Sequence, residues 1–242
     1  MPKKLRLDQL LVGRGLFPSR EQARRAVMAG TVKVGTRIAV KPSELLEEEA
    51  PIAIKPTAKY VGRGALKLES ALDYFKIDVR GKRALDIGAS TGGFTDCMLQ
   101  RGAGKVYAVD VGYGQLNWKL RNDPRVVVRE GVNARYLNRE DFPEQFDLAV
   151  CDVSFISVTL ILPAVAPLLQ SDGEMVILIK PQFEVGKGQV GKGGIVRDPE
   201  LHRSACRRIE DAVRLMNYTT DMIESPILGA EGNKEFLLYA RH

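Results

Sequence analysis

The sequence contains very little histidine and cysteine, which narrows the chemistry that the chain can carry out. Its only histidines are His202 and His242, and its three cysteines, Cys97, Cys151 and Cys206, are far apart with no CxxC pair. An odd, scattered set of cysteines argues against a disulfide framework and fits a reducing cytoplasm. A zinc site and a histidine-based catalytic triad therefore lack the residues that they need, and we expect no metal.

The sequence also lacks a long apolar run. The first residues, MPKK, lead into LRLD rather than into an apolar stretch, so no secretory signal is visible. The least polar stretch, residues 160–169, contains two prolines and is too short to span a bilayer. We expect a cytoplasmic protein with no stable membrane association.

Positive charge is concentrated at the front of the chain. Residues 1–43 contain ten Lys and Arg against two Asp and Glu, and residues 1–59 contain twelve against six. The remainder holds 24 residues of each sign, so the whole excess of +6 lies in the first quarter. A basic segment attached to a neutral body is typical of a module that binds a polyanion.

Residues 1–58 are predicted to form a small α+β domain. Leucines at residues 7–11 suit a short helix, and Ser19, followed by glutamine three residues later, predicts a second helix that Gly30 ends. The alternation within residues 31–40 predicts two short strands. The candidate contacts to a polyanion in this domain are Arg6, Arg14, Arg20, Arg24, Arg25 and Lys33. The alternative is a generic basic surface.

After an expected linker at residues 59–64, residues 65–242 alternate short apolar strands with helical segments. This predicts an α/β, Rossmann-like domain with a seven-stranded, mostly parallel sheet covered on both faces. The candidate strands are residues 83–87, 106–111, 125–129, 146–151, 174–179, 219–224 and 235–240. Helices are expected at residues 66–75, 93–101 and 158–169. No helix separates the last two strands, so the last strand should be antiparallel.

The first of these strands runs into a glycine-rich turn, LDIGASTGGF. Ligands of open α/β sheets bind beyond the carboxyl ends of the strands, and glycines let the backbone approach a ligand. The candidate cofactor contacts are Asp86, Gly88, Ala89, Ser90, Thr91, Gly92, Gly93 and Phe94. The spacing is G-x-x-x-G-G, which disfavours a dehydrogenase with its G-x-G-x-x-G. The alternative is a packing turn with no ligand.

Asp110 ends the second strand and supports the ligand interpretation. An acidic side chain at this position can accept both ribose hydroxyls of an adenosine. Together with the glycine turn, it predicts a ligand that contains adenosine.

The chain resembles the TlyA/haemolysin A family of bacterial ribosomal RNA methyltransferases in five motifs, LDIGASTGGFTD, YAVDVGYGQL, CDVSFIS, LIKPQFE and GNKEFLLY. Its front segment, LRLDQLLVGRGLFPSREQARRAVMAGTVKV, is similar to an RNA-binding module shared with a small-subunit ribosomal protein and pseudouridine synthases. The resemblance covers nearly the whole chain. It implies a methyltransferase fold shared with FtsJ-type enzymes, S-adenosyl-L-methionine as cofactor, and 2′-O-methylation of cytidine ribose in ribosomal RNA or ribosomal subunits.

The resemblance also implies a catalytic tetrad. Its members match Lys67 in VGRGALKLES, Asp152 in CDVSFIS, Lys180 in LIKPQFE and Glu235 in GNKEF. Asp152 and Lys180 end neighbouring predicted strands, and Glu235 begins an antiparallel one, so these three should share one rim of the sheet. We hypothesise that Lys180, oriented by Asp152 and Glu235, stabilises the developing alkoxide or accepts the hydroxyl proton, while Lys67 steers the hydroxyl. The alternative is ordinary ion pairing at strand ends.

Three weaker features complete the candidate site. Asp152 also counts as a cofactor contact, and Asn133, which follows the third strand, is a candidate contact to adenine or else a turn residue. The segment GKGQVGK resembles a phosphate loop, but glycine stands where Ser or Thr is needed, so we reject nucleotide hydrolysis. Its Lys187 and Lys192 are candidates for RNA phosphate contacts, or else belong to a solvated loop. Cys151 is predicted to be a buried strand residue and not a nucleophile.

Two other functions remain as alternatives. A non-catalytic ribosome-binding protein would keep the cofactor fold, although the apparently complete tetrad disfavours it. A membrane-active haemolysin is suggested by the family's name, but the sequence shows no spanning segment and no long, strongly amphipathic helix.

Overall fold

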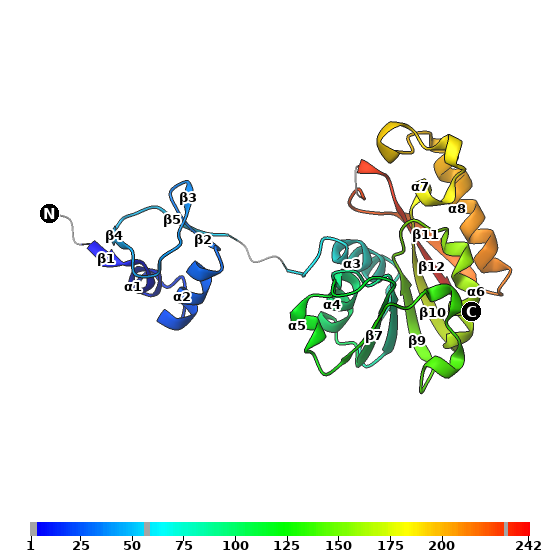
Figure 1. Cartoon of the computed structure of the whole chain (residues 1–242), viewed down its shortest axis with the longest axis horizontal. Coiled ribbons are helices and arrows are strands. Elements are labelled where there is room, and N and C mark those ends of the chain that lie inside the picture. Colours follow the sequence, from blue (N-terminus) through cyan, green and yellow to red (C-terminus); the bar gives the residue numbers. More distant parts are fainter. Residues whose placement is uncertain (1–3, 56–58, 230–231) are drawn as a thin grey trace. The chain divides into compact units, whose positions relative to one another are not determined.

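The structure is a computed structural model that describes residues 4–55, 59–229 and 232–242, apart from the Lys187 side chain. The chain forms two compact units, Met1–Lys59 and Tyr60–His242 (Figure 1). The expected linker at residues 59–64 extends too far, because Tyr60 is buried and its hydroxyl donates a hydrogen bond to Glu69 at 2.8 Å. The N–H of Val61 likewise donates to the carboxylate of Asp96 at 2.8 Å. Residues 60–64 therefore belong to the second unit.

The front unit combines two helices with five very short strands. In chain order these are β1 (Lys4–Arg6), α1 (Leu7–Gly13), α2 (Arg20–Met28), β2 (Val32–Val34), β3 (Arg37–Ile38), β4 (Leu45–Glu47) and β5 (Ile52–Ile54). β1 pairs with β4, and β2 lies between β3 and β5, with all pairs antiparallel. Leu7, Leu11 and Val27 form its core. The Ser19 side chain accepts the N–H of Gln22 at 3.3 Å, as the sequence predicts.

The second unit is built on a seven-stranded sheet with the order β11-β12-β10-β9-β6-β7-β8. Its strands are β6 (Arg83–Ile87), β7 (Lys105–Asp110), β8 (Val126–Glu130), β9 (Phe146–Cys151), β10 (Leu169–Ile179), β11 (Thr219–Glu224) and β12 (Phe236–Arg241). β12 runs antiparallel to both of its neighbours, β10 and β11, and the other neighbouring pairs of this sheet are parallel. The predicted α/β class, with its last strand antiparallel, is therefore confirmed.

Helices cover both faces of this sheet (Figure 1). They are α3 (Ala65–Tyr74), α4 (Gly93–Gln100), α5 (Trp118–Arg121), α6 (Leu162–Val165), α7 (Pro181–Glu184) and α8 (Pro199–Arg214), with short 3₁₀ turns η1 (Ala134–Tyr136), η2 (Arg139–Asp141), η3 (Val158–Leu160), η4 (Ala166–Leu168), η5 (Lys187–Gln189) and η6 (Lys192–Gly194). Successive strand residues point to opposite faces. Ala84 accordingly joins the core beside α3 and α4, and Leu85 joins the core beside α6 and α8.

The single helix predicted over residues 158–169 is wrong. The segment breaks into η3, α6 and η4, and Leu169 already belongs to β10. Pro163 and Pro167 explain the breaks, because proline has no N–H to donate within a helix. In the part of the chain that the structure describes, no helix has both the length and the apolar character needed to cross a membrane.

Candidate active site

The glycine turn brings the end of β6 against the end of β9. Gly88 has φ +82°, and a Cβ on it would lie 2.2 Å from the backbone oxygen of Asp152. The N–H of Asp152 in turn donates to the carbonyl of Ile87 at 2.9 Å. Only glycine combines this positive φ with so close an approach. The turn therefore places the Asp152 backbone beside the predicted cofactor loop.

Asp110, at the end of β7, is oriented by two backbone donors. Its carboxylate accepts the N–H of Ser90 at 2.8 Å and the N–H of Gly112 at 2.7 Å. Each carboxylate oxygen retains a second lone pair, so a fixed Asp110 can still accept hydroxyl groups. The geometry suits the two hydroxyls of a ribose.

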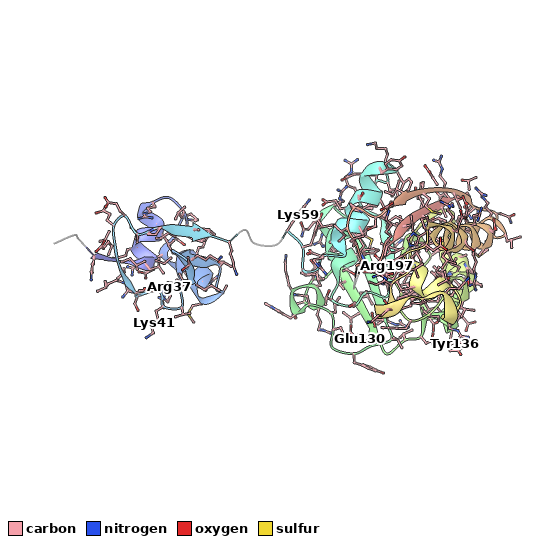
Figure 2. The ribbon with its side chains drawn as sticks, turned by 90° about the horizontal axis from the view of Figure 1, so that it is seen from above. Arg37, Lys41, Lys59, Glu130, Tyr136 and Arg197 are labelled. Atoms are coloured by element: carbon pink, nitrogen blue, oxygen red, sulfur yellow. The ribbon has the colours of Figure 1, made fainter. Side chains whose placement is uncertain are left out.

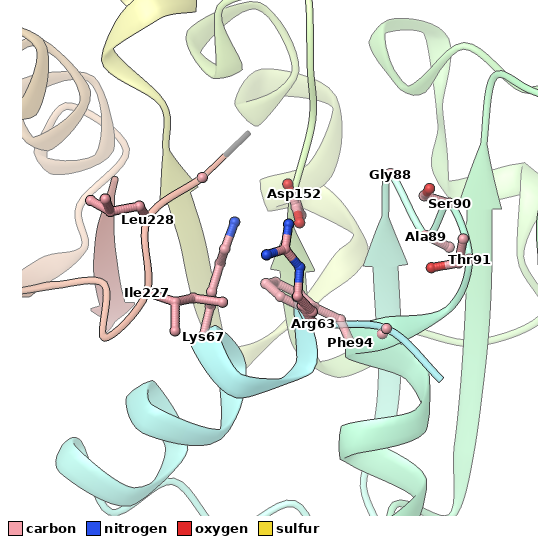
Figure 3. Close-up of a pocket in the computed structure, with 14 residues that line it drawn as sticks. Arg63, Lys67, Gly88, Ala89, Ser90, Thr91, Phe94, Asp152, Ile227 and Leu228 are labelled. Carbon is pink, nitrogen blue, oxygen red and sulfur yellow. The ribbon is translucent and has the colours of Figure 1, made fainter. Parts of the chain in front are cut away.

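Two cavities open along this rim and meet at Gly88, Ser90 and Asp152. The larger, of about 450 Å³, is lined by Asp110, Asn133 and mainly apolar side chains from the ends of β6, β7 and β9. The smaller, of about 280 Å³, is shown in Figure 3. Its lining residues include Arg63, Lys67, Gly88, Ala89, Ser90, Thr91, Gly93, Phe94, Asp152, Leu228 and Gly229.

Two predicted cofactor contacts, Asp86 and Gly92, line neither cavity. Asp86 is fully buried beneath the turn, where it accepts the Thr95 hydroxyl at 2.6 Å. This burial raises the pKa of Asp86 to about 7. Gly92 faces the side chains of Leu116 and Leu120, which a Cβ would meet at 2.8 and 2.2 Å. Both residues therefore support the turn from its buried side and do not face a cavity.

Asn133 makes a turn interaction, and its predicted contact to adenine stays a prediction. Its side chain accepts the N–H of Arg135 at 3.1 Å, which is a turn interaction, and the residue also lines the larger cavity. Cys151 is fully buried in β9, and this burial raises the pKa of its thiol to about 12. A thiol in this state is a poor nucleophile at neutral pH.

The four tetrad residues lie at the same rim and form two ion pairs. The Lys180 amine lies 2.6 Å from Asp152 Oδ1 and donates to Ser154 Oγ at 2.9 Å. Lys67, from α3, pairs with Glu235, which precedes β12. Glu235, which we expected to orient Lys180 together with Asp152, pairs instead with Lys67.

Both pairs are largely removed from solvent. The side chains of Lys67 and Lys180 are 10% and 12% exposed, and that of Glu235 is 2% exposed. Buried charges of this kind require close partners, since desolvation disfavours them strongly. Lys67 and Asp152 line the smaller cavity directly. The rim therefore holds two cations and two carboxylates next to the predicted cofactor loop.

Sequence reasoning missed two residues at this site. Arg63 lines the smaller cavity, and Figure 3 shows its guanidinium directed toward Asp152. Phe155 lines the larger cavity, is 92% exposed, and has φ +66°. Its ring lies 5.2 Å from that of Phe183, centroid to centroid. Arg63 stands between two glycines in VGRGA, which is a visible signal, whereas the exposure of Phe155 depends on tertiary structure.

The basic residues of the front unit divide into two groups. Arg6 and Arg20 both pair with Asp8, at 3.0 and 3.1 Å, and the hydrogen bond from Arg6 helps to lower the pKa of this carboxyl. Arg14 donates to the carbonyls of Glu48 and Ala50. These three arginines therefore also hold the unit together.

The second group lies at the surface. Arg24 is exposed on α2, Arg25 forms an exposed pair with Glu21, and Lys33 is half-buried on β2. Figure 2 labels another basic residue of this unit, Lys41, which is exposed. In the second unit, Lys192 is exposed in η6, while the Lys187 side chain lies outside the described residues.

Comparison with known proteins agrees with this geometry. The family described as "FtsJ-like methyltransferase" matches residues 60–242. The chain belongs to this family. An S4 domain matches residues 5–52, within the front unit of this FtsJ-like methyltransferase.

Several similar proteins cover nearly the whole FtsJ-like chain. YqxC of Bacillus subtilis is 50% identical over 240 residues, spanning 98% of this chain and 85% of YqxC. TlyA of Mycobacterium tuberculosis, named 16S/23S rRNA (cytidine-2′-O)-methyltransferase, is 47% identical over 244 residues, spanning 100% of this chain and 91% of TlyA. A solved structure from Streptococcus thermophilus has a TM-score of 0.74 at 46% identity and covers 100% of this chain and 89% of that one.

Proposed function

We propose that this methyltransferase transfers a methyl group from S-adenosyl-L-methionine to the 2′-hydroxyl of a cytidine ribose in ribosomal RNA. The observation that carries the proposal is the pair of lysine–carboxylate contacts, Lys180 with Asp152 and Lys67 with Glu235, at the rim where two cavities meet. The name of the TlyA relative supports the choice of cytidine and of ribosomal RNA.

The larger cavity fits the adenosine part of the cofactor. Asp110 offers carboxylate oxygens, already oriented by backbone N–H groups, to the ribose hydroxyls. Asn133 and the apolar wall around Ile156 can enclose the adenine. The backbone of Gly88–Ser90 leads into the smaller cavity, where the Arg63 guanidinium can donate hydrogen bonds to the methionine carboxylate. Bound here, the cofactor supplies an electrophilic methyl group on a positively charged sulfur.

The lysines act on the hydroxyl. Lys180, held between Asp152 and Ser154, either accepts the hydroxyl proton as a neutral amine or stabilises the alkoxide as an ammonium. Lys67, held by Glu235, lines the smaller cavity and fixes the hydroxyl for in-line attack.

The front unit supplies the contacts to RNA in this proposal. Structured RNA is recognised largely by shape and by its phosphates, for which exposed arginines are suited. Arg24, Arg25 and Lys33 are available at the surface. Arg6, Arg14 and Arg20 contribute charge while they also bind within the unit.

Methyl transfer to purified ribosomal subunits tests the proposal. The full chain is incubated with each subunit and isotope-labelled S-adenosyl-L-methionine, and the labelled nucleotide is mapped by mass spectrometry. We expect label on a cytidine ribose. Binding to subunits without transfer would instead support a non-catalytic ribosome-binding protein, and label on a base would contradict the assignment of the hydroxyl.

A further inference from the structure

Asn233 is a buried polar residue that the proposed chemistry does not use. It is 2% exposed and stands two residues before Glu235. Both ends of its side-chain amide bind the backbone of another loop. Its Oδ1 accepts the N–H of Val196 at 3.0 Å, and its Nδ2 donates to the carbonyl of Gly194 at 2.9 Å. Removing such an amide would leave two backbone groups without their partner, which is costly where they are buried.

On one side, Asn233 is tied to the Glu235 carboxylate through Gly229. The N–H of Gly229 donates to the backbone oxygen of Asn233 at 2.8 Å. Gly229 also packs against Glu235 so closely that a Cβ there would lie 2.0 Å from Oε1. A shift of Asn233 therefore moves the backbone that confines the partner of Lys67.

On the other side, Asn233 holds the basic loop, residues 186–197, which follows α7. The exposed Lys192 and Arg197 belong to this loop, and Figure 2 labels Arg197. Gly193 and Gly194 have φ of +76° and +75°. Because glycine has no side chain, other residues must hold this part of the loop in place. Asn233 and His202, whose Nε2 lies 2.9 Å from the Val196 oxygen, hold its carboxyl-terminal end.

We infer that Asn233 is a positioning residue that couples the basic loop to the Lys67–Glu235 pair. When RNA phosphates bind Lys192 and Arg197, the two hydrogen bonds of the Asn233 amide hold the basic loop at a fixed position relative to Glu235. Asn233 lines neither of the two cavities at the rim, so it acts through Glu235 and not on the cofactor. The inference rests on the proposed function, because it requires RNA phosphates at the loop and chemistry at Lys67.

The first test compares kcat with cofactor binding. In the full chain, Asn233→Ala should lower kcat for methyl transfer by about 10- to 100-fold, as expected when reacting groups are slightly misplaced. The Kd for S-adenosyl-L-methionine, measured by titration calorimetry, should change by less than about twofold. Gln145→Ala is the matched control, since it deletes an amide hydrogen bond to the Leu169 carbonyl at the opposite end of β9. The control should keep wild-type kcat.

The second test separates coupling from a merely structural role. Lys192→Ala and Arg197→Ala are combined and introduced into both the wild-type and the Asn233→Ala chain. If Asn233 transmits docking of the loop, the combined change lowers kcat in the wild-type chain but has little further effect in the variant. Purely structural damage would instead make the two effects multiply. Asn233→Asp is close in shape and keeps the acceptor for Val196, but it replaces the donor to Gly194 with a carboxylate oxygen. It is used for the same mutant cycle if the alanine variant does not fold.

Each outcome decides a different point. Near-wild-type kcat in Asn233→Ala, or effects that multiply, overturns the inference while leaving the proposed function intact. A wild-type chain that binds the cofactor but transfers no methyl group to ribosomal RNA overturns the proposed function and the inference with it.

Discussion

The front unit and the rim of the sheet both depend on positive charge, but they hold it in opposite ways. Arg24 and Arg25 are exposed, and the side chains of the Arg25–Glu21 pair on α2 are 77% and 73% exposed. Lys67 and Lys180 are about nine-tenths buried, and each has one carboxylate partner. An exposed ion pair contributes little stability, whereas a buried charge is costly without its partner.

The difference fits the use that we propose for each region. Solvated charges act together, reach phosphates at long range and are weakened by salt. Lys67 and Lys180 are each held in place by a carboxylate. Groups that act on a reacting atom need such fixed positions. Variants of each region can test this difference, beginning with the change that should matter most.

The largest effect should follow removal of the Lys180 amine. We expect Lys180→Ala to lower kcat by about 100- to 10,000-fold, the range typical of a lost proton-transfer group. The Kd for S-adenosyl-L-methionine should stay within about threefold, because Lys180 lines neither cavity at the rim. Lys82→Ala is the matched control, since it breaks a partly buried pair with Glu174 elsewhere in the sheet. Near-wild-type turnover in Lys180→Ala would show that the assignment is wrong.

Breaking the Lys67–Glu235 pair should have the next largest effect, which we expect in the free energy of unfolding. Lys67→Met leaves the Glu235 carboxylate buried without its partner, so the free energy of unfolding should fall by about 3–5 kcal/mol in urea denaturation. Combining it with Glu235→Leu removes both charges and should recover most of that stability, but not activity. If Lys67→Met costs less than about 1 kcal/mol, the Lys67–Glu235 pair is solvated like the exposed Arg25–Glu21 pair.

Asp86 allows a test with pH, because it is a buried carboxyl without a cationic partner among the described residues. Burial raises its pKa in the folded chain to about 7, so between about pH 4 and 7 the folded chain holds a proton that the unfolded chain has released. The contribution of Asp86 to stability therefore declines as pH rises through this range, by at most about 1.4 kcal/mol per pH unit.

Asp86→Asn isolates this contribution. It keeps an acceptor for the Thr95 hydroxyl and removes the titration. Relative to this variant, the wild-type chain should lose stability between pH 4 and 7, as measured by the urea midpoint at each pH. Parallel pH curves for the two chains would contradict a raised pKa.

The sequence predicted the second unit better than the first, for reasons visible in particular elements. The strand at residues 83–87 was predicted to the residue, because an apolar run ends in a glycine turn. β4 and β5 were missed, because three-residue strands beside glutamates and Pro51 carry too little periodicity. The broken helix at residues 158–169 could have been foreseen from its two prolines.

The pairing within the site could not be predicted. Ile179 lies opposite Phe236 in the ladder, so Lys180 and Glu235 follow as neighbours, and the sequence suggested that they bind each other. Their side chains instead turn to Asp152 and to Lys67. The strand order places Asp152, Lys180 and Glu235 at one rim. Which carboxylate each lysine contacts depends on side-chain rotamers and on the position of α3, and the sequence does not give these.

The smallest effect per residue should come from the exposed arginines, and it should appear in binding and not in stability. Arg24→Gln with Arg25→Gln removes one solvated pair, worth about 0.3–0.5 kcal/mol, so the urea midpoint should hardly change. RNA affinity should fall, and the slope of log K against log salt should decrease by about 0.7–0.9 for each phosphate that the variant no longer neutralises. Arg20→Gln sharpens the comparison, because it also weakens the hold on the buried Asp8 and should lower stability measurably. If the double variant keeps both the affinity and the salt slope of the wild-type chain, these arginines do not bind RNA, and the front unit must dock through other residues or not at all.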